Sequence, residues 1–321
     1  MIVLWRLTKL CNLACGFCAY DRRVPQPRVQ SLPAEVERLA ALFGAYRESV
    51  GQPVLLSWLG GEPMLWPGVL DLSGRLKRQF GLRTSITTNG TRSWQPSSAQ
   101  ALSESFDEIT FSVDALETTH ERLRGWPGGM ARLAEGIQRL ANLRRPGSGP
   151  LLRANVVLMR DTLPEFAELC MRLADWGIQE ITFNQLGGRD RPDFHRAQAL
   201  GLPDISRLRE LLPPLVAALA DRGVRLHADT SYVARLEATA AGRPVAVTEC
   251  EARRPTIFID EFARIAACSF TLDSHSLSSD SVRTISDIAE LRDRLAARRR
   301  SAPAAVCNDC PSTQVFAKFG T

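Results

Sequence analysis

The chain alternates short apolar runs, typical of β-strands, with longer segments whose apolar residues have helical spacing. The expected strands are Ile2–Leu7, Val54–Leu59, Arg83–Thr88, Glu108–Val113, Leu151–Met159 and Glu180–Asn184, and the expected helices are Leu32–Arg47, Val69–Phe80, Met130–Arg144, Leu163–Trp176 and Ile205–Asp221. Strands that alternate with helices of this length form parallel βα units, whose active sites lie at the carboxyl ends of the strands. The alternation therefore predicts an α/β fold with a functional site at one edge of a parallel sheet.

Three cysteines follow the first expected strand within one short loop. Cys11, Cys15 and Cys18 have the spacing C-x3-C-x2-C, and Phe17 precedes the third. Thiolates are the usual protein ligands of iron–sulfur clusters. Three of them can hold three irons of a [4Fe–4S] cube and leave the fourth iron open, so that a small molecule can bind the metal directly.

Zinc and disulfides are the other interpretations of this loop. Structural zinc takes four ligands, and the nearest histidine in the sequence is His120. Disulfides require an oxidising compartment, but the opening residues MIVLWRLTKL lack the basic start and the long apolar stretch of a signal peptide. We therefore expect a cytoplasmic protein whose cysteine loop holds an iron–sulfur cluster.

With this spacing and with Phe17 in place, the loop resembles that of the radical S-adenosylmethionine (SAM) superfamily. The resemblance implies a partial (β/α)6 TIM-like radical SAM barrel over residues 1–225, a [4Fe–4S] cluster on Cys11, Cys15 and Cys18, and SAM as cofactor. In that family SAM chelates the open iron, and its reductive cleavage gives a 5′-deoxyadenosyl radical that removes a hydrogen atom from the substrate. An external one-electron donor such as flavodoxin or ferredoxin is also implied.

Motifs at the strand ends match positions where this family contacts SAM. Gly60-Gly61-Glu62-Pro63 resembles the GGE motif: two glycines let the backbone approach a ligand, and Glu62 can accept hydrogen bonds from the SAM ammonium group. Taken alone, the same residues read as a plain strand-end turn. The resemblance implies further SAM contacts from Phe17, Tyr20, Asn89, Ser112, Asn155 with Arg153 beside it, and Ile178 in the segment Gly177–Ile181.

The substrate side offers two candidate catalytic residues, Asp114 and His120. Together with Arg124 they match a Ser-x-Asp, His and Arg run that relatives carry after the fourth strand. The pKa of a histidine lies near neutrality, so His120 can bind substrate or move a proton; a purely structural role for His120 stays open. Other residues expected to face the cavity are Asn184, Gln185, Arg189, Asp229 and Tyr232.

A second cysteine group lies near the end of the chain and consists of Cys250, Cys268, Cys307 and Cys310. Four cysteines can complete a zinc site or fully ligate a second [4Fe–4S] cluster, and the spacing alone does not decide between them. After a radical SAM barrel, the arrangement resembles the short Twitch form of the SPASM domain, which implies an auxiliary cluster in residues 226–321. Two short strands, Thr256–Asp260 and Arg264–Cys268, would join through a turn that has Ala263 where glycine is usual.

The layout is nearest to radical SAM dehydrogenases and epimerases of sugars and aminocyclitols. Ligation by four cysteines suits an auxiliary cluster that conducts electrons, so we expect an oxidoreductase acting on a sugar, aminocyclitol or nucleoside-like intermediate of natural-product biosynthesis. Modification of a ribosomally made peptide, by cross-linking, epimerisation or decarboxylation, is the alternative. The remaining cysteine, Cys170, lies on the apolar stripe of a helix and is expected in the core, where it cannot serve as a hydrogen-atom donor.

Composition supports a small-molecule partner. Hydrophobic residues make up 45% of the chain, charged residues 23%, and the net charge is +5. No apolar run reaches the roughly 18 residues that span a bilayer, and the most basic stretch, Arg292–Arg300, has no interleaved aromatic residues. We therefore expect neither a membrane nor a nucleic-acid partner. A zinc-stabilised nucleic-acid-binding protein without catalysis is the hypothesis from another class, and the GGEP motif weighs against it.

Overall fold

The structure is a computed structural model that describes residues 1–145, 148–188, 190–250 and 256–316. The strands of these residues form one ten-stranded sheet in the order β10-β9-β8-β1-β2-β3-β4-β5-β6-β7. The strands are β1 (Ile2–Thr8), β2 (Leu55–Gly60), β3 (Arg83–Thr88), β4 (Glu108–Ser112), β5 (Leu151–Leu158), β6 (Glu180–Gln185), β7 (Arg225–Leu226), β8 (Thr256–Ile259), β9 (Arg264–Ala266) and β10 (Leu277–Ser278). Strands β1 to β7 run parallel in chain order, and β8 joins the free edge of β1, also in parallel.

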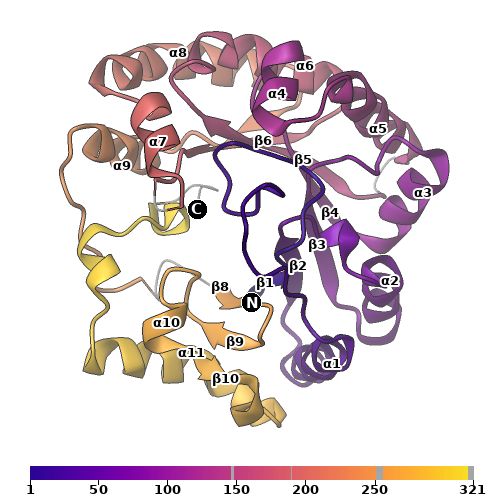
Figure 1. Ribbon diagram of the computed structural model, residues 1–321. Coiled ribbons are helices and arrows are strands. Elements are labelled where there is room, and N and C mark those ends of the chain that lie inside the picture. The colour runs from indigo at the N-terminus through magenta and orange to yellow at the C-terminus, as the bar shows by residue number, and fades with distance from the viewer. Residues whose placement is uncertain (146–147, 189, 251–255, 317–321) are drawn as a thin grey trace.

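The helices lie around the outside of this curved sheet, and the cysteine loop, in indigo, lies near the centre of the ring (Figure 1). They are α1 (Pro33–Val50), α2 (Val69–Phe80), α3 (Pro96–Ser105), α4 (Glu117–Arg124), α5 (Gly129–Leu143), α6 (Phe166–Asp175), α7 (Pro192–Gln198), α8 (Leu202–Ala220), α9 (Thr230–Ala240), α10 (Leu272–His275) and α11 (Ile285–Ser301). Short 3-10 helices span Pro63–Leu65, Leu163–Glu165, Ser279–Ser281, Ala305–Asp309 and Thr313–Phe316. Within the described ranges, no helix combines the length and apolarity needed to span a membrane.

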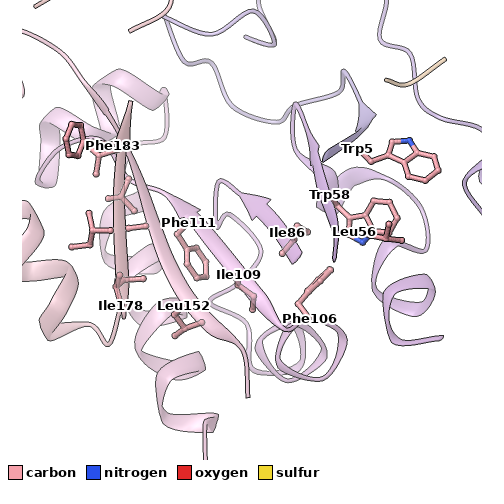
Figure 2. Close-up of a cluster of buried hydrophobic side chains, with 14 of the residues drawn as sticks. Trp5, Leu56, Trp58, Ile86, Phe106, Ile109, Phe111, Leu152, Ile178 and Phe183 are labelled. Atoms are coloured by element: carbon pink, nitrogen blue, oxygen red, sulfur yellow. The ribbon is translucent and has the colours of Figure 1, made fainter. Parts of the chain in front are cut away.

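The core lies between the outer face of the sheet and the helices. Side chains alternate between the two faces of a strand, and Figure 2 shows buried side chains of this core, most of them from one face of the strands: Trp5, Leu56, Trp58, Ile86, Phe106, Ile109, Phe111, Leu152, Ile178 and Phe183. All ten are at most 1% exposed, and at about 1.5–3 kcal/mol for each large apolar side chain such burial is the main stabilising term. The residues between them in the strands face the concave side.

The predicted α/β fold with parallel βα units is confirmed, and the expected strands and helices agree closely with those observed. The expected helix Leu163–Trp176 begins with a 3-10 turn, so that α6 itself starts at Phe166. The sequence does not predict α3, α4, α7 or α9. Helix α3 illustrates the reason, because it is rich in serine and buries only Ala99, Leu102 and Ser105, which leaves little apolar periodicity to detect.

Strands β8 and β9 form the expected hairpin near the end of the chain. Ala263 adopts a left-handed conformation in its turn, with φ 57°. The carboxylate of Asp260 accepts hydrogen bonds from the backbone nitrogens of Phe262 and Arg264, at 3.0 and 2.8 Å. These bonds hold the turn although alanine replaces the usual glycine. Because β8 pairs with β1, the hairpin belongs to the same sheet as the barrel strands, and the boundary expected between residues 225 and 226 stays a prediction.

Candidate functional site

The cysteine loop is fixed to a helix end that lies far along the chain. The backbone nitrogen of Ala14 donates to the carbonyl of Arg124 at 3.1 Å, and that of Gly16 donates to the carbonyl of Leu123 at 3.4 Å. Gly125 ends α4 in a left-handed conformation, with φ 61°, directly against Ala14. The loop therefore owes its shape to the carboxyl end of α4 as well as to its own sequence.

The three thiols of this loop lie close to one another. The Cys11 and Cys18 groups each raise the pKa of Cys15, and burial, the larger cause, brings that pKa to about 12. Burial also raises the pKa of Cys11 and Cys18. Asn89 Nδ2 donates to Cys11 Sγ at 3.9 Å. A metal bound here would displace the thiol protons, and donors such as Asn89 tune the potential of a cluster.

The donor set of the loop fits a cluster better than a single metal ion. Within the described ranges, no three His, Cys, Asp or Glu side chains converge on one metal position. A [4Fe–4S] cube binds each thiolate at a different iron, so its ligands stand farther apart than the ligands of one ion. Three neighbouring thiols on one loop are therefore compatible with a cube and do not form a mononuclear zinc site.

The two glycines of the GGE motif allow β2 to approach the start of the cysteine loop. A Cβ atom at Gly60 would lie too close to the carbonyl oxygen of Thr8, and one at Gly61 too close to that of Leu10. The backbone nitrogens of Gly61 and Glu62 donate to these same carbonyls, at 2.8 and 2.7 Å. The close approach that requires glycine is thus between the end of β2 and the loop, whereas the sequence had suggested an approach to the ligand.

Glu62 is 1% exposed and joins the ends of β2 and β3. Its Oε1 accepts from the Met64 nitrogen at 3.0 Å and from Thr88 Oγ1 at 2.8 Å, and its Oε2 accepts from the Asn89 nitrogen at 2.7 Å. Burial raises the pKa of this carboxyl group. A carboxylate offers about four acceptor positions, so Oε2 keeps one for a further donor.

The two catalytic candidates, Asp114 and His120, lie in the turn from β4 to α4 and in α4 itself. Asp114 is 1% exposed; its Oδ2 accepts from Arg124 Nε at 2.7 Å, and its Oδ1 accepts from the Val157 nitrogen at 3.0 Å. His120 is equally buried, and its Nδ1 accepts from the Asp114 nitrogen at 3.2 Å. Burial lowers the pKa of His120 to about 3, which keeps the ring neutral. Both side chains are buried and hydrogen-bonded, and their catalytic role stays a prediction.

The inner face of β5 and β6 is polar. Asn155 Oδ1 accepts from Thr182 Oγ1 at 3.0 Å and from Asn184 Nδ2 at 2.9 Å. Ser112, on β4, is in register with Asn155. Arg153, one inward position nearer the amino end, forms ion pairs with Glu108 and Glu180 at 3.2 and 2.7 Å. Asn155 and Ser112 are thus neighbours, whereas Arg153 belongs to a charged group at the other end of the strands.

Ile178 does not lie with the other predicted SAM contacts. It precedes β6, is 1% exposed and belongs to the main core, beside Leu152 in Figure 2. This position is at the amino end of the parallel strands, opposite to the cysteine loop. Ile178, predicted to contact SAM, thus lies away from the cysteine loop, because it precedes the amino end of β6.

The aromatic candidates Phe17 and Tyr20 lie beside the cysteine loop. The Phe17 ring packs against Phe194 of α7, with centroids 6.1 Å apart. The hydroxyl of Tyr20 accepts from Arg6 Nη1 at 3.0 Å, and burial raises its pKa. Arg6 also forms an ion pair with Glu261 of the β8–β9 turn. The sequence had not singled out Arg6, Phe194 or Glu261, because these contacts join residues remote in the chain.

Of the other residues expected to face the cavity, Asp229 and Tyr232 make structural contacts, and Arg189 lies outside the described residues. Asp229 caps α9 by accepting from the Ser231 nitrogen at 2.8 Å. Tyr232 is fully buried, and its hydroxyl accepts from the Gln185 nitrogen at 3.3 Å.

The four cysteines of the second group line one cavity. Cys250, Cys268, Cys307 and Cys310 share it with Phe270 and His275, among others, and its volume is about 480 Å³ with the open mouth included. Backbone hydrogen bonds join the segment before Cys250 to the segment that carries Cys307 and Cys310. The Val247 nitrogen donates to the Cys307 carbonyl and the Cys310 nitrogen to the Val245 carbonyl, both at 2.9 Å. Cys170, which was expected in the core, is 0% exposed on α6.

Comparison with known proteins gives one family. The profile described as "Radical SAM superfamily" matches residues 5–173. The chain is 28% identical over 185 residues to the AdoMet-dependent heme synthase of Oleidesulfovibrio alaskensis, a match that covers 55% of this chain and 44% of the relative. It is 33% identical over 221 residues to a UPF0026 protein of Helicobacter pylori, covering 67% and 69%. Molybdenum cofactor biosynthesis protein 1 of Homo sapiens is 32% identical over 170 residues, covering 51% and 25%. The chain thus spans less than half of the heme synthase and about a quarter of the human protein.

Solved structures share the fold at low sequence identity. Streptococcus suis SuiB bound to S-adenosylmethionine has a TM-score of 0.67 and 18% identity, and the match covers 100% of this chain and 72% of SuiB. The structure described as native anSMEcpe with bound AdoMet has a TM-score of 0.65 and 16% identity, covering 97% and 88%. At such identities the likeness concerns the arrangement of strands and helices.

Proposed function

The chain belongs to the radical SAM superfamily, and from this membership we propose that it is an enzyme that removes a hydrogen atom from a polar small molecule. When bound, a [4Fe–4S] cluster and SAM supply the one-electron cleavage that yields the 5′-deoxyadenosyl radical. The observation that carries the proposal is the loop in which Cys11, Cys15 and Cys18 lie together against the end of α4. These thiols would hold the cluster, and that of Cys15 is buried.

Residues at the ends of β2, β3 and β4 would hold and orient SAM. Oε2 of Glu62 has an acceptor position left for the methionyl ammonium group, and Asn89 lies between this carboxylate and Cys11. Ser112 and Asn155 line the inner face near them. Phe17 and Tyr20 would bound the cofactor on the side of the loop. These roles follow from the resemblance of the strand-end motifs to those of the family.

The inner face of the sheet supports a hydroxyl- or amine-bearing substrate. Its polar side chains, which alternate with the apolar residues of the core, include Ser57, Ser85, Thr87, Thr110, Ser112, Asn155, Thr182 and Asn184. Hydroxyl and amide groups both donate and accept hydrogen bonds, as do the groups of sugars, aminocyclitols and nucleosides. A site built from such groups would reject apolar analogues, because its polar atoms would then be left unpaired.

The second cysteine group supports an auxiliary cluster with a role in oxidation. Four thiols line one cavity, which agrees with full ligation of a second [4Fe–4S] cluster in a Twitch-like segment over residues 226–321. A fully ligated cluster can accept an electron from a substrate radical. We therefore favour two-electron dehydrogenation over epimerisation, since Cys170 is buried in the core and is no hydrogen-atom donor.

The test is hydrogen transfer from labelled substrates to 5′-deoxyadenosine. The full chain is reconstituted anaerobically, given SAM and a strong reductant, and incubated with deuterated aminocyclitols, nucleosides or short peptides. We expect deuterium in 5′-deoxyadenosine with one of the polyol classes, none with Cys15→Ala, and an unchanged result with Cys170→Ala as matched control.

Three outcomes divide the proposal. Deuterium transfer from peptides alone would favour a peptide-modifying enzyme; SuiB, which shares the fold, is described bound to a precursor peptide. Formation of 5′-deoxyadenosine without transfer from any tested class would refute the substrate class and leave the reaction type standing. If the iron-loaded protein cleaves SAM under none of these conditions, the proposed radical SAM activity is refuted.

A further inference from the structure

The carboxyl end of α4 places a buried cation beside the cysteine loop. The carbonyl of Arg124 accepts from the Ala14 nitrogen at 3.1 Å, and the Cys15 thiol lies 3.9 Å from the same carbonyl. The side chain of Arg124 is 9% exposed, and its guanidinium lies over the Phe17 ring, 5.5 Å from the centroid. The same residue thus fixes the backbone of the loop and brings a positive charge to it.

A single carboxylate partners this guanidinium from the β4 side. Nε and Nη2 of Arg124 donate to Asp114 Oδ2 at 2.7 and 2.6 Å. The Asp114 side chain is 0% exposed, and its Oδ1 is held by the Val157 nitrogen at 3.0 Å. The pair cannot swing away into solvent, because Asp114 is tied to β5 and Arg124 to the loop.

Arg124 and Asp114 place charges of opposite sign beside the cysteine loop. The guanidinium of Arg124 lies 5.5 Å from the ring of Phe17, the residue before Cys18, and its Nε is 2.7 Å from the carboxylate of Asp114. In a buried setting such charges are poorly screened by water or salt. Any negative charge at the thiol sulfurs is therefore sensitive to both residues.

We propose that Arg124 is a positioning residue that raises the reduction potential of the cluster on the cysteine loop, and that Asp114 limits this effect. The inference rests on the proposed function, since it requires the loop to hold the cluster. Reduction adds an electron, and hence negative charge, to the cluster. A nearby guanidinium stabilises the reduced form, and a nearby carboxylate destabilises it. The potential is thus set by a balance between two side chains that do not ligate iron.

The experiment is a redox titration of the reconstituted full chain followed by electron paramagnetic resonance. The signal that changes shape on addition of SAM reports the cluster of the cysteine loop. Arg124→Met removes the cation, and Asp114→Asn removes the anion while keeping an acceptor for Val157. Arg122→Met is the matched control, because Arg122 lies on the same helix and is exposed. Arg124→Lys keeps the positive charge and serves if the methionine variant does not fold.

The expected shifts have opposite signs. Arg124→Met lowers the midpoint potential and Asp114→Asn raises it, each changing the ratio of reduced to oxidised cluster at fixed potential on the order of tenfold, or about 59 mV for one electron. Arg122→Met leaves the midpoint unchanged, and Arg124→Lys stays nearer to wild type than Arg124→Met.

Two results would overturn the inference in distinguishable ways. A purely structural clamp would move both variants in the same direction, or lower cluster content without a shift in midpoint, and either result refutes the role of charge while the proposed function stands. Wild-type protein without a SAM-sensitive cluster signal would refute the proposed function and the inference together.

Discussion

Glu62, at the end of β2, accepts a hydrogen bond from the backbone nitrogen of Asn89, at the end of β3, over 2.7 Å. The two residues lie in different βα units, and Asn89 in turn donates to Cys11 Sγ. A buried carboxylate thereby links two strand ends to the first cysteine of the loop.

Glu62→Gln should destabilise the protein and weaken SAM binding. A glutamine can offer one oxygen, so its NH2 group would face one of the three donors that Glu62 now accepts, and a buried donor would lose its partner. We expect a loss of about 1–3 kcal/mol in the free energy of unfolding, measured by denaturant titration of the cluster-free chain, and a lower SAM affinity by equilibrium dialysis. Glu104→Gln, exposed on α3, is the control. Equal stability of the two variants would contradict the bridging role.

Replacing one cysteine of the second group should remove iron selectively. Cys268→Ala is expected to lower the iron content of reconstituted protein by about half, because two clusters become one, while SAM cleavage persists and oxidised product is lost. Cys170→Ala should keep full iron content, since Cys170 is buried in the core. Iron and sulfide analysis with Mössbauer spectroscopy decides the matter. Wild-type iron content in Cys268→Ala would argue against a second cluster.

Acid should weaken the charged group at the amino ends of β5 and β6. The hydrogen bond with His227, followed by that with Arg153, holds the pKa of Glu180 at about 2, below its ordinary 4.5. A depressed carboxyl pKa contributes stability that is present above the ordinary value and is lost as the pH falls from about 4.5 toward 2. Because the group is partly solvated, we expect on the order of 1 kcal/mol.

The test of this prediction compares thermal midpoints over the same pH range. In Arg153→Met the fall between pH 4.5 and 3 should be shallower than in wild type, whereas Arg139→Met, at an exposed helix pair, should follow wild type. Parallel curves for Arg153→Met and wild type would show that the ion pair does not contribute.

Ala263→Gly should stabilise the β8–β9 turn. The left-handed conformation at φ 57° costs an L-residue about 1–2 kcal/mol, and glycine adopts it freely while losing up to about 1 kcal/mol of chain entropy on folding. The net gain is expected near 0.5–1 kcal/mol, seen as a higher thermal midpoint. Ala296→Gly, in the helix α11, should lower the midpoint. A lower thermal midpoint for Ala263→Gly would show that the left-handed conformation of Ala263 does not destabilise the turn.

The sequence predicted the βα units well because their signals are local. The bounds expected for β3 and α2 matched the observed ones, and the glycines of the GGE motif lay where two backbones approach closely. The Asp114–Arg124 pair and the Phe17–Phe194 contact could not be predicted, since they depend on how distant segments meet. Ile178 is a different case: the family resemblance predicts a SAM contact, whereas the residue precedes β6 and packs in the core.

The position of β1 has a consequence for biosynthesis. This strand is made before β8, yet it pairs with β2 on one side and with β8 on the other. Until residues 256–259 have been made, β1 presents a row of unpaired backbone groups, which is the kind of edge that templates aggregation. Shortened chains that end before β8 should therefore accumulate in inclusion bodies, because β8 covers the exposed edge of β1.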